Sequence, residues 1–243
     1  MPPELRRKGG ATRKRGRRRA ALAALAGLAT LAFASPAGGW STGVQAAARA
    51  AQAHKPNLRE DPVSYGAHRR AQMAAYSERH YGSREWRLDR HDVIVLHFTA
   101  TDSYAAAWNT FESNAPNLGE SPGVCSHYIV EQDGTIDELV PPRIRCRHTV
   151  GLNHRSIGIE MVQETGRGPH WADRQILERR PQARAAVRLV AWLQGRYGIA
   201  TGNVIGHSMA NDSPFFKDLE GWTNDHSDWL KRDVKTFRKR LRR

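Results

Sequence analysis

One apolar run constrains the fold of this chain more than any other feature. Residues 93–96 read Val-Ile-Val-Leu, and the chain turns polar directly afterwards at His97. A short, continuously apolar run of this kind is typical of a strand buried on both faces, as in the centre of an α/β sheet. Residues 156–162 form a similar run that holds a single acid, Glu160, and residues 204–206 form a third that leads into His207. We therefore expect a fold built around buried strands, two of which end in histidine.

Segments with helical character alternate with these strands. The clearest helix is predicted over residues 181–197, where apolar residues recur at helical spacing, Pro181 suits the first turn and Gly198 the end. Other helices are predicted over residues 62–81, 103–111 and 228–241. A hairpin is predicted within residues 127–140, because Asp133-Gly134 is a strong turn signal. This alternation predicts an α/β fold, a mixed central β-sheet flanked by helices.

The positive charge of the chain is concentrated at its two ends. Of a formal net charge of +14 over 243 residues, residues 1–38 contribute +8 and residues 231–243 contribute +7. The part between them is close to neutral, so a groove that binds nucleic acid is not implied, and we expect no nucleic-acid partner.

The N-terminus has the pattern of an export signal. An arginine-rich stretch at residues 13–19 precedes an apolar run of about 15 residues and then small residues up to position 38. The run is shorter than the ~20 residues that cross a bilayer stably, so we expect a cleaved signal over residues 1–38 and no stable membrane span afterwards. An uncleaved anchor is the alternative, and the Sec and twin-arginine routes both remain open. The remaining chain divides into a linker (39–61), an N-terminal helical extension (62–89) and a domain with a basic C-terminal helix (90–243).

The chain has two cysteines, Cys125 and Cys146. This number excludes a disulfide-stapled miniature scaffold and a zinc finger with several cysteine ligands. Both lie in predicted strand regions, so in an exported protein they could form a bridge. Two buried free thiols are an equally good interpretation.

Two strand-end histidines and a downstream aspartate form a candidate metal site. His97 and His207 each follow a buried strand, and residues 224–229 bring Asp228 to the start of the last predicted helix. Two imidazoles and one carboxylate are a zinc ligand set that leaves a fourth position for water. Zinc lowers the pKa of that water to about 7. Glu160 is costly in a packed core unless it has a partner; facing the same cleft, it could transfer protons.

Four segments carry a resemblance to a known family: VIVLHFTATD (93–102), GVCSHYIVEQDGTI (123–136), CRHTVGLNHRSIGIEMV (146–162) and VIGHSMANDSP (204–214). In this order they resemble the zinc-dependent N-acetylmuramoyl-L-alanine amidases of type 2, in the peptidoglycan recognition protein superfamily. The resemblance covers roughly residues 90–230.

The resemblance implies roles for individual residues. The first two zinc ligands fall on His97 and His207, the catalytic glutamate on Glu160, and a pocket histidine on His148. The third ligand has two placements. Asp218 lies near the usual distance but lacks the surrounding motif, whereas Asp228 keeps the basic-x-Asp spacing after an insertion. We favour Asp228, with His226 in place of the lysine that stabilises the oxyanion.

The resemblance also implies an activity. The chain would be a secreted peptidoglycan hydrolase that holds one Zn2+ and uses zinc-activated water to cleave the amide between N-acetylmuramic acid and L-alanine. Thr99, Trp108 and Asn153 are candidates to line the substrate groove. The basic last helix can be attracted to anionic wall polymers. One alternative is a module of the same fold that binds muropeptide without cleaving it, and another is a cationic membrane-active protein.

Overall fold

The computed structural model describes residues 53–242 and contains a six-stranded mixed sheet. The strands are β1 (Arg59–Glu60), β2 (Val93–Phe98), β3 (Tyr128–Val130), β4 (Ile136–Glu138), β5 (Ser156–Met161) and β6 (Val204–Gly206). Their order across the sheet is β1-β4-β3-β5-β2-β6, and every neighbouring pair is parallel except the β3–β4 hairpin. The predicted α/β class, a mixed sheet flanked by helices, is confirmed.

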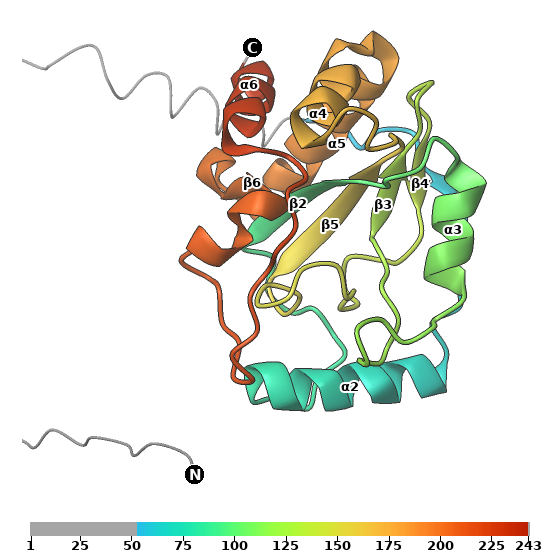
Figure 1. Cartoon of the computed structure of the whole chain (residues 1–243), viewed down its shortest axis with the longest axis vertical. Helices are drawn as coiled ribbons and strands as arrows, with labels where there is room; N and C mark the ends of the chain where they lie inside the picture. The colour runs from blue at the N-terminus through green and yellow to red at the C-terminus, as the bar shows by residue number, and fades with distance from the viewer. Residues whose placement is uncertain (1–52, 243) are drawn as a thin grey trace, which may run out of the picture. The chain divides into compact units, whose positions relative to one another are not determined.

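The helices surround this sheet (Figure 1). They are α2 (Ala67–Tyr81), α3 (Tyr104–Glu112), α4 (Pro169–Glu178), α5 (Arg180–Tyr197) and α6 (Lys231–Leu241), with 3-10 turns η1 (Thr201–Asn203) and η2 (His207–Asp212). Helix α4 was not predicted; only Arg179 separates its last residue, Glu178, from the first residue of α5. Helix α6 begins three residues later than predicted, because Trp229 takes a left-handed conformation with φ 56°.

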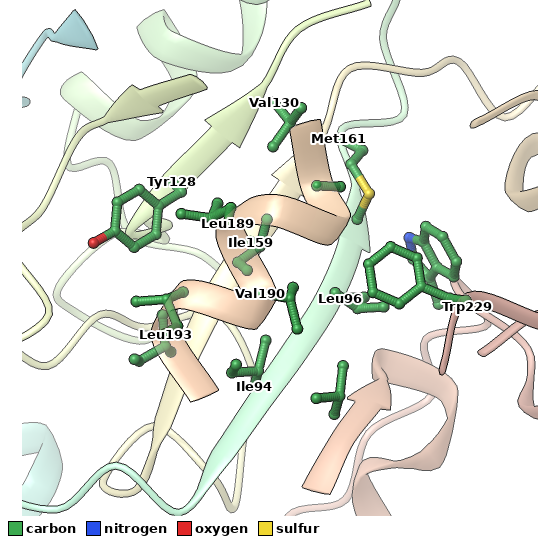
Figure 2. Close-up of a cluster of buried hydrophobic side chains, with 14 of the residues drawn as sticks. Ile94, Leu96, Tyr128, Val130, Ile159, Met161, Leu189, Val190, Leu193 and Trp229 are labelled. Atoms are coloured by element: carbon green, nitrogen blue, oxygen red, sulfur yellow. The ribbon is translucent and has the colours of Figure 1, made fainter. Parts of the chain in front are cut away.

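The alternation of side chains along the strands divides the core into two faces. On one face, Ile94, Leu96 and Ile159 pack against α5, where Leu189 and Leu193 are fully buried (Figure 2). Each such side chain contributes roughly 1.5–3 kcal/mol by leaving water. Helices α4 and α6 supply further residues to the same cluster, so three helices cover this face.

The other face has smaller apolar clusters, and its central strands also carry the polar residues His97 and Glu160. Val93 and Val95 point to this face, and so does His97, two residues further along β2. On the neighbouring strand β5, Glu160 stands in register with His97. Since β2, β5 and β6 are parallel, their carboxyl ends lie at one edge of the sheet, and His207 follows β6 there. Strand alternation therefore brings His97 and Glu160 together, and the parallel pairing of β6 with β2 brings His207 to the same edge.

The structure also shows the state of the two cysteines and the fold of part of the predicted linker. Cys125 and Cys146 form a disulfide with Cα atoms 5.4 Å apart, so the free-thiol alternative does not hold. Strand β1 lies within the interval predicted as linker, where it pairs with β4 and forms an edge of the sheet.

The predicted export signal, residues 1–38, lies outside the described residues. Within residues 53–242, no helix is long and apolar enough to span a membrane.

Candidate metal centre

Three of the predicted ligands meet at the carboxyl edge of the sheet. His97 Nδ1 lies 3.1 Å from His207 Nδ1 and 3.3 Å from Asp228 Oδ2, and His207 Nδ1 lies 3.2 Å from Asp228 Oδ1. All three residues are buried. Within the described residues they are the one group of His, Cys, Asp or Glu side chains close enough to share a metal ion.

Hydrogen bonds around His97 determine which ring nitrogen faces the cluster. Ser156 donates its hydroxyl to the Leu152 carbonyl (2.8 Å), so its oxygen accepts from His148 Nε2 (3.2 Å). Burial lowers the pKa of His148 well below its ordinary value, so this ring is neutral and its Nδ1 is an acceptor. His97 Nε2, 3.1 Å from that nitrogen, is then the donor, and His97 Nδ1 keeps a free lone pair. The pKa of His97 is itself lowered to about 4, first by burial and then by the neighbouring His207.

The second histidine presents the same atom. His207 Nε2 lies 3.0 Å from the carboxamide oxygen of Asn224, which is an acceptor. The hydrogen of this ring therefore sits on Nε2, and Nδ1 is free.

These donors fit a zinc ion. Two unprotonated imidazole nitrogens and a carboxylate face one another across 3.1–3.3 Å, an arrangement that repels unless a cation or a proton lies between them. Tetrahedral zinc with bonds of about 2.0–2.1 Å separates its ligand atoms by about 3.3 Å. His97, His207 and Asp228 are the residues that would hold it.

Glu160 lies beside this cluster as a buried acid. It is 9% exposed, and its Oε2 has no hydrogen-bond partner among residues 53–242. Burial raises the pKa of Glu160 well above its ordinary value, and the nearby charge of Asp228 raises it further. A carboxyl group with a raised pKa can exchange protons near neutral pH.

His226 lies at the mouth of the site. Its ring stacks on that of His207, with centroids 4.1 Å apart, and its Nδ1 lies 3.8 Å from Asp228 Oδ1. Its side chain is 59% exposed. Burial, and then the neighbouring His207, lower the pKa of His226, so the neutral ring is favoured at neutral pH.

A cavity of about 650 Å³ opens above the cluster, and Glu160 and His226 both line it. Of the four predicted substrate-binding residues, Thr99 and His148 also line this cavity. Trp108 does not; its indole donates to the Asp61 carbonyl (3.1 Å). Asn153 is fully buried, and its oxygen accepts from the backbone N–H groups of His148 and Thr149, so it shapes that turn from within.

Several residues that line the cavity were not predicted from the sequence. Asn117 and Leu118 belong to a loop that Arg147 fixes through backbone carbonyl groups, including those of Asn117 and Pro122. Leu118 is 74% exposed, an unusual position for a large apolar side chain. Pro169, at the start of α4, lines the cavity from the other side. No periodicity marks these loop residues, so the sequence offered no signal for them.

Asp218, the alternative third ligand, has other partners. Its carboxylate accepts from His80 Nδ1 (2.7 Å) and from the backbone N–H groups of Glu220 and Trp222. It holds this loop to α2 and is not part of the metal cluster.

Two histidines, an aspartate and a buried glutamate thus meet at one end of a mixed α/β sheet, and this donor set fits a metal ion. The model of the N-acetylmuramoyl-L-alanine amidase family, Amidase_2, matches residues 87–226, and the chain belongs to this family. The match includes His97, Glu160 and His207 and ends two residues before Asp228.

Solved structures of several amidases are similar to the chain. The hydrolase AmiA from Staphylococcus aureus, in complex with its ligand, shares 16% identity at a TM-score of 0.47, over 86% of this chain and 93% of that one. The endolysin amidase LysCS from Clostridium intestinale shares 16% identity at a TM-score of 0.45, over 76% and 96%. AmiD from E. coli, solved with anhydro-N-acetylmuramic acid-L-Ala-D-γ-Glu-L-Lys, shares 25% identity at a TM-score of 0.38, over 49% of each chain. None of the curated proteins compared with the chain matches it.

Proposed function

We propose that this protein is a zinc-dependent amidase that hydrolyses the bond between N-acetylmuramic acid and the L-alanine of the stem peptide. One observation carries the proposal. In a member of the amidase family, a three-residue metal-ligand set and an unpartnered buried glutamate share one open cavity.

His97, His207 and Asp228 would hold one zinc ion per chain. When bound, zinc would polarise the scissile carbonyl and activate water for attack. Glu160 is placed to take a proton from the attacking water and to deliver it to the leaving amine of L-alanine.

His226 would act at the mouth of the cavity. The resemblance puts His226 in place of a lysine that stabilises the oxyanion, but the lowered pKa of this ring favours its neutral form. A neutral imidazole still has one N–H group, so we assign His226 as a hydrogen-bond donor to the carbonyl oxygen on which charge develops. Thr99 and His148 would line the path of the substrate. Hydrolysis of the amide between glycan and peptide would yield a lactyl acid on the glycan and a free L-alanyl stem peptide.

The alternative is a module that binds muropeptide without cleaving it. Glu160 favours the enzyme, because a buried carboxyl group without a partner costs stability and does nothing for binding alone.

A paired measurement tests the proposal. Bound zinc per chain and release of L-alanyl amino termini from purified peptidoglycan would be measured for the wild type and for Asp228→Ala, with the exposed Asp212→Ala as a matched control. We expect about one zinc and amine release in the wild type and the control, and loss of both in Asp228→Ala. Zinc and activity that survive in Asp228→Ala would mean that Asp228 is not a ligand and would overturn the proposed ligand set. A wild type with neither zinc nor release, but with intact wall binding, would be a recognition module.

We also propose that the protein is secreted and that α6 helps to hold it at the cell wall. The helix buries Val234 and Phe237 against the core and exposes Lys235 and Lys239. Exposed positive charges attract anionic wall polymers, and salt screens that attraction. Binding to purified walls should therefore weaken between 50 mM and 500 mM salt, and salt-independent binding would contradict this part of the proposal. Mature protein in the growth medium, with its N-terminus near position 38, would support export.

A further inference from the structure

The side chain of Asn224 contacts His207, one of the three ligand residues, without belonging to the ligand set itself. Its Oδ1 lies 3.0 Å from His207 Nε2, on the side of the ring opposite the metal cluster. Its Nδ2 lies 2.9 Å from the Val150 carbonyl and 3.2 Å from Asn211 Oδ1. The side chain of Asn211 in turn binds the backbone of Asn224: its Nδ2 donates to the Asn224 carbonyl (2.8 Å) and its Oδ1 accepts from Asn224 N (2.9 Å). We call these hydrogen bonds the Asn211–Asn224 pair.

These contacts fix the orientation of the carboxamide. Both neighbours of Nδ2 are acceptors, the Val150 carbonyl and Asn211 Oδ1, so they require the NH2 group on that side. The oxygen must then face His207, where it can only accept. The hydrogen of the His207 ring is held on Nε2, and the lone pair on Nδ1 points toward His97 and Asp228.

The Asn211–Asn224 pair also positions the segment that carries Asp228, the third ligand. Asn224 lies four residues before Asp228, in a stretch without helix or strand, and Asn211 lies in η2, the turn that His207 begins. The Asn211–Asn224 pair thus connects the segment of one ligand to the element of another.

We propose that Asn224 is a positioning residue of the metal centre, which holds His207 in the tautomer and orientation that bind a divalent cation. The inference rests on the proposed zinc site, but it concerns a residue outside the ligand set. Partners of this kind on ligating histidines typically change metal affinity by 10–100-fold when they are removed.

Two variants separate this role from simple loop packing. Asn224→Asp keeps an acceptor for His207 Nε2 and loses the donor to Val150, whereas Asn224→Leu keeps the size and loses the acceptor. We expect zinc Kd values, measured by competition with a chelator, to rise about 10–100-fold in Asn224→Leu and to stay within about 3-fold of the wild type in Asn224→Asp. Asn57→Ala, at an exposed asparagine distant from the site, serves as the control and should not change the Kd. Equal weakening in both Asn224 variants would mean that the residue only packs the loop, and would overturn the proposal.

A second readout uses the zinc-free protein. Ring nitrogen chemical shifts at pH 8 should show His207 with its hydrogen on Nε2 in the wild type and in Asn224→Asp, and a mixture of tautomers in Asn224→Leu. The same mixture in the wild type would overturn the proposal even if zinc binds. A wild type that binds no zinc would overturn the proposed function and this inference together, whereas a wild type that binds zinc with the same Kd as Asn224→Leu would overturn the inference alone.

Discussion

The two halves of the metal centre are held in place by different means. His97 and Glu160 stand on β2 and β5, two central strands that pair over six residues each. His207 begins the 3-10 turn η2 directly after β6, and Asp228 lies in irregular backbone before α6. We call the first pair the sheet half and the second pair the loop half. In the sheet half, backbone pairing and strand alternation fix the side chains, whereas in the loop half other side chains fix them.

The contacts of the loop half show how much depends on few groups. Ser208 binds the Asp228 carbonyl through its N–H group and the Trp229 carbonyl through its hydroxyl. Trp229 is fully buried and donates from its indole to the His97 carbonyl (3.1 Å), which joins the two halves. The backbone of Trp229 passes so close to Gly206 that a Cβ there would lie 1.9 Å from the Trp229 carbonyl oxygen. Position 206 therefore accepts only glycine, and the loop half depends on this close approach.

The largest effect should come from the acid of the sheet half. Glu160→Gln keeps the size of the side chain and removes its ability to transfer protons, so we expect turnover to fall by ~10²–10⁴-fold. Zinc binding should not change, because Glu160 is not one of the ligands. Amine release from peptidoglycan and zinc content, measured on the same samples, check both statements. Unchanged cleavage would remove Glu160 from the mechanism.

This contrast between the halves also explains what the sequence could predict. Apolar runs and their polar ends located β2, β5 and β6, so His97, Glu160 and His207 stood out as candidates from the residues themselves, and the family resemblance then implied their roles. Asp228 also stood out before the last predicted helix, but the choice between it and Asp218 as third ligand needed the family resemblance. Asn224 and the loop around Leu118 could not be predicted, because they act through contacts between segments distant in sequence. Helix α4 was missed because a single residue separates it from α5.

The next effect concerns the wall of the cavity on the sheet side. The Cys125–Cys146 disulfide closes a loop of 21 residues, and Cys125 lines the cavity. Replacing both cysteines by serine should lower the free energy of unfolding by about 3 kcal/mol, chiefly because the unfolded chain is less constrained. Zinc affinity should change little if strand pairing positions His97. Urea unfolding and chelator competition measure the two quantities, and reduced wild type is the control. A large loss of zinc affinity would show that the sheet half is not self-supporting.

Acid should weaken the sheet half through a buried histidine that binds no metal. His127 is fully buried; its Nδ1 accepts from Gly158 N and its Nε2 contacts the Ile144 carbonyl. Burial lowers the pKa of His127 to about 4. Between about pH 6.5 and pH 4 the unfolded chain binds a proton at this position and the folded protein does not, so stability is present above pH 6.5 and is lost as the pH falls.

This linkage amounts to about 2 kcal/mol between pH 7 and pH 5. His127→Gln, whose amide can both accept and donate, should remove that share of the pH dependence. Urea midpoints at the two pH values for both proteins measure the difference. Parallel pH profiles for the wild type and the variant would show that His127 does not limit stability in acid.

The smallest effect should isolate the loop half. Asp173 of α4 is fully buried, and its two carboxylate oxygens accept from the backbone N–H groups of Trp229 (3.0 Å) and Leu230 (2.8 Å). Asp173→Asn leaves one of these N–H groups without an acceptor, which costs ~1–3 kcal/mol. The nearby carboxylate of Asp233 is unfavourable in the wild type, so we expect about 1 kcal/mol, at the low end of that range.

The stability cost of Asp173→Asn should change with pH in a predictable direction. Burial, opposed by the two backbone N–H groups and assisted by the neighbouring Asp233, raises the pKa of Asp173 to about 7. Between about pH 4 and pH 7 the folded protein therefore binds more protons than the unfolded chain, and wild-type stability falls as the pH rises. Asparagine does not ionise, so the cost of Asp173→Asn should shrink from pH 5 to pH 8. Asp173 holds the residues next to Asp228, so Asp173→Asn should also weaken zinc binding. The Trp229–His97 hydrogen bond and the paired strands should keep the sheet half in place. The exposed Asp212→Asn is the control. Weaker zinc binding without that pH trend would mean that Asp173 acts through shape alone, and unchanged zinc binding would mean that the loop half keeps its geometry without α4.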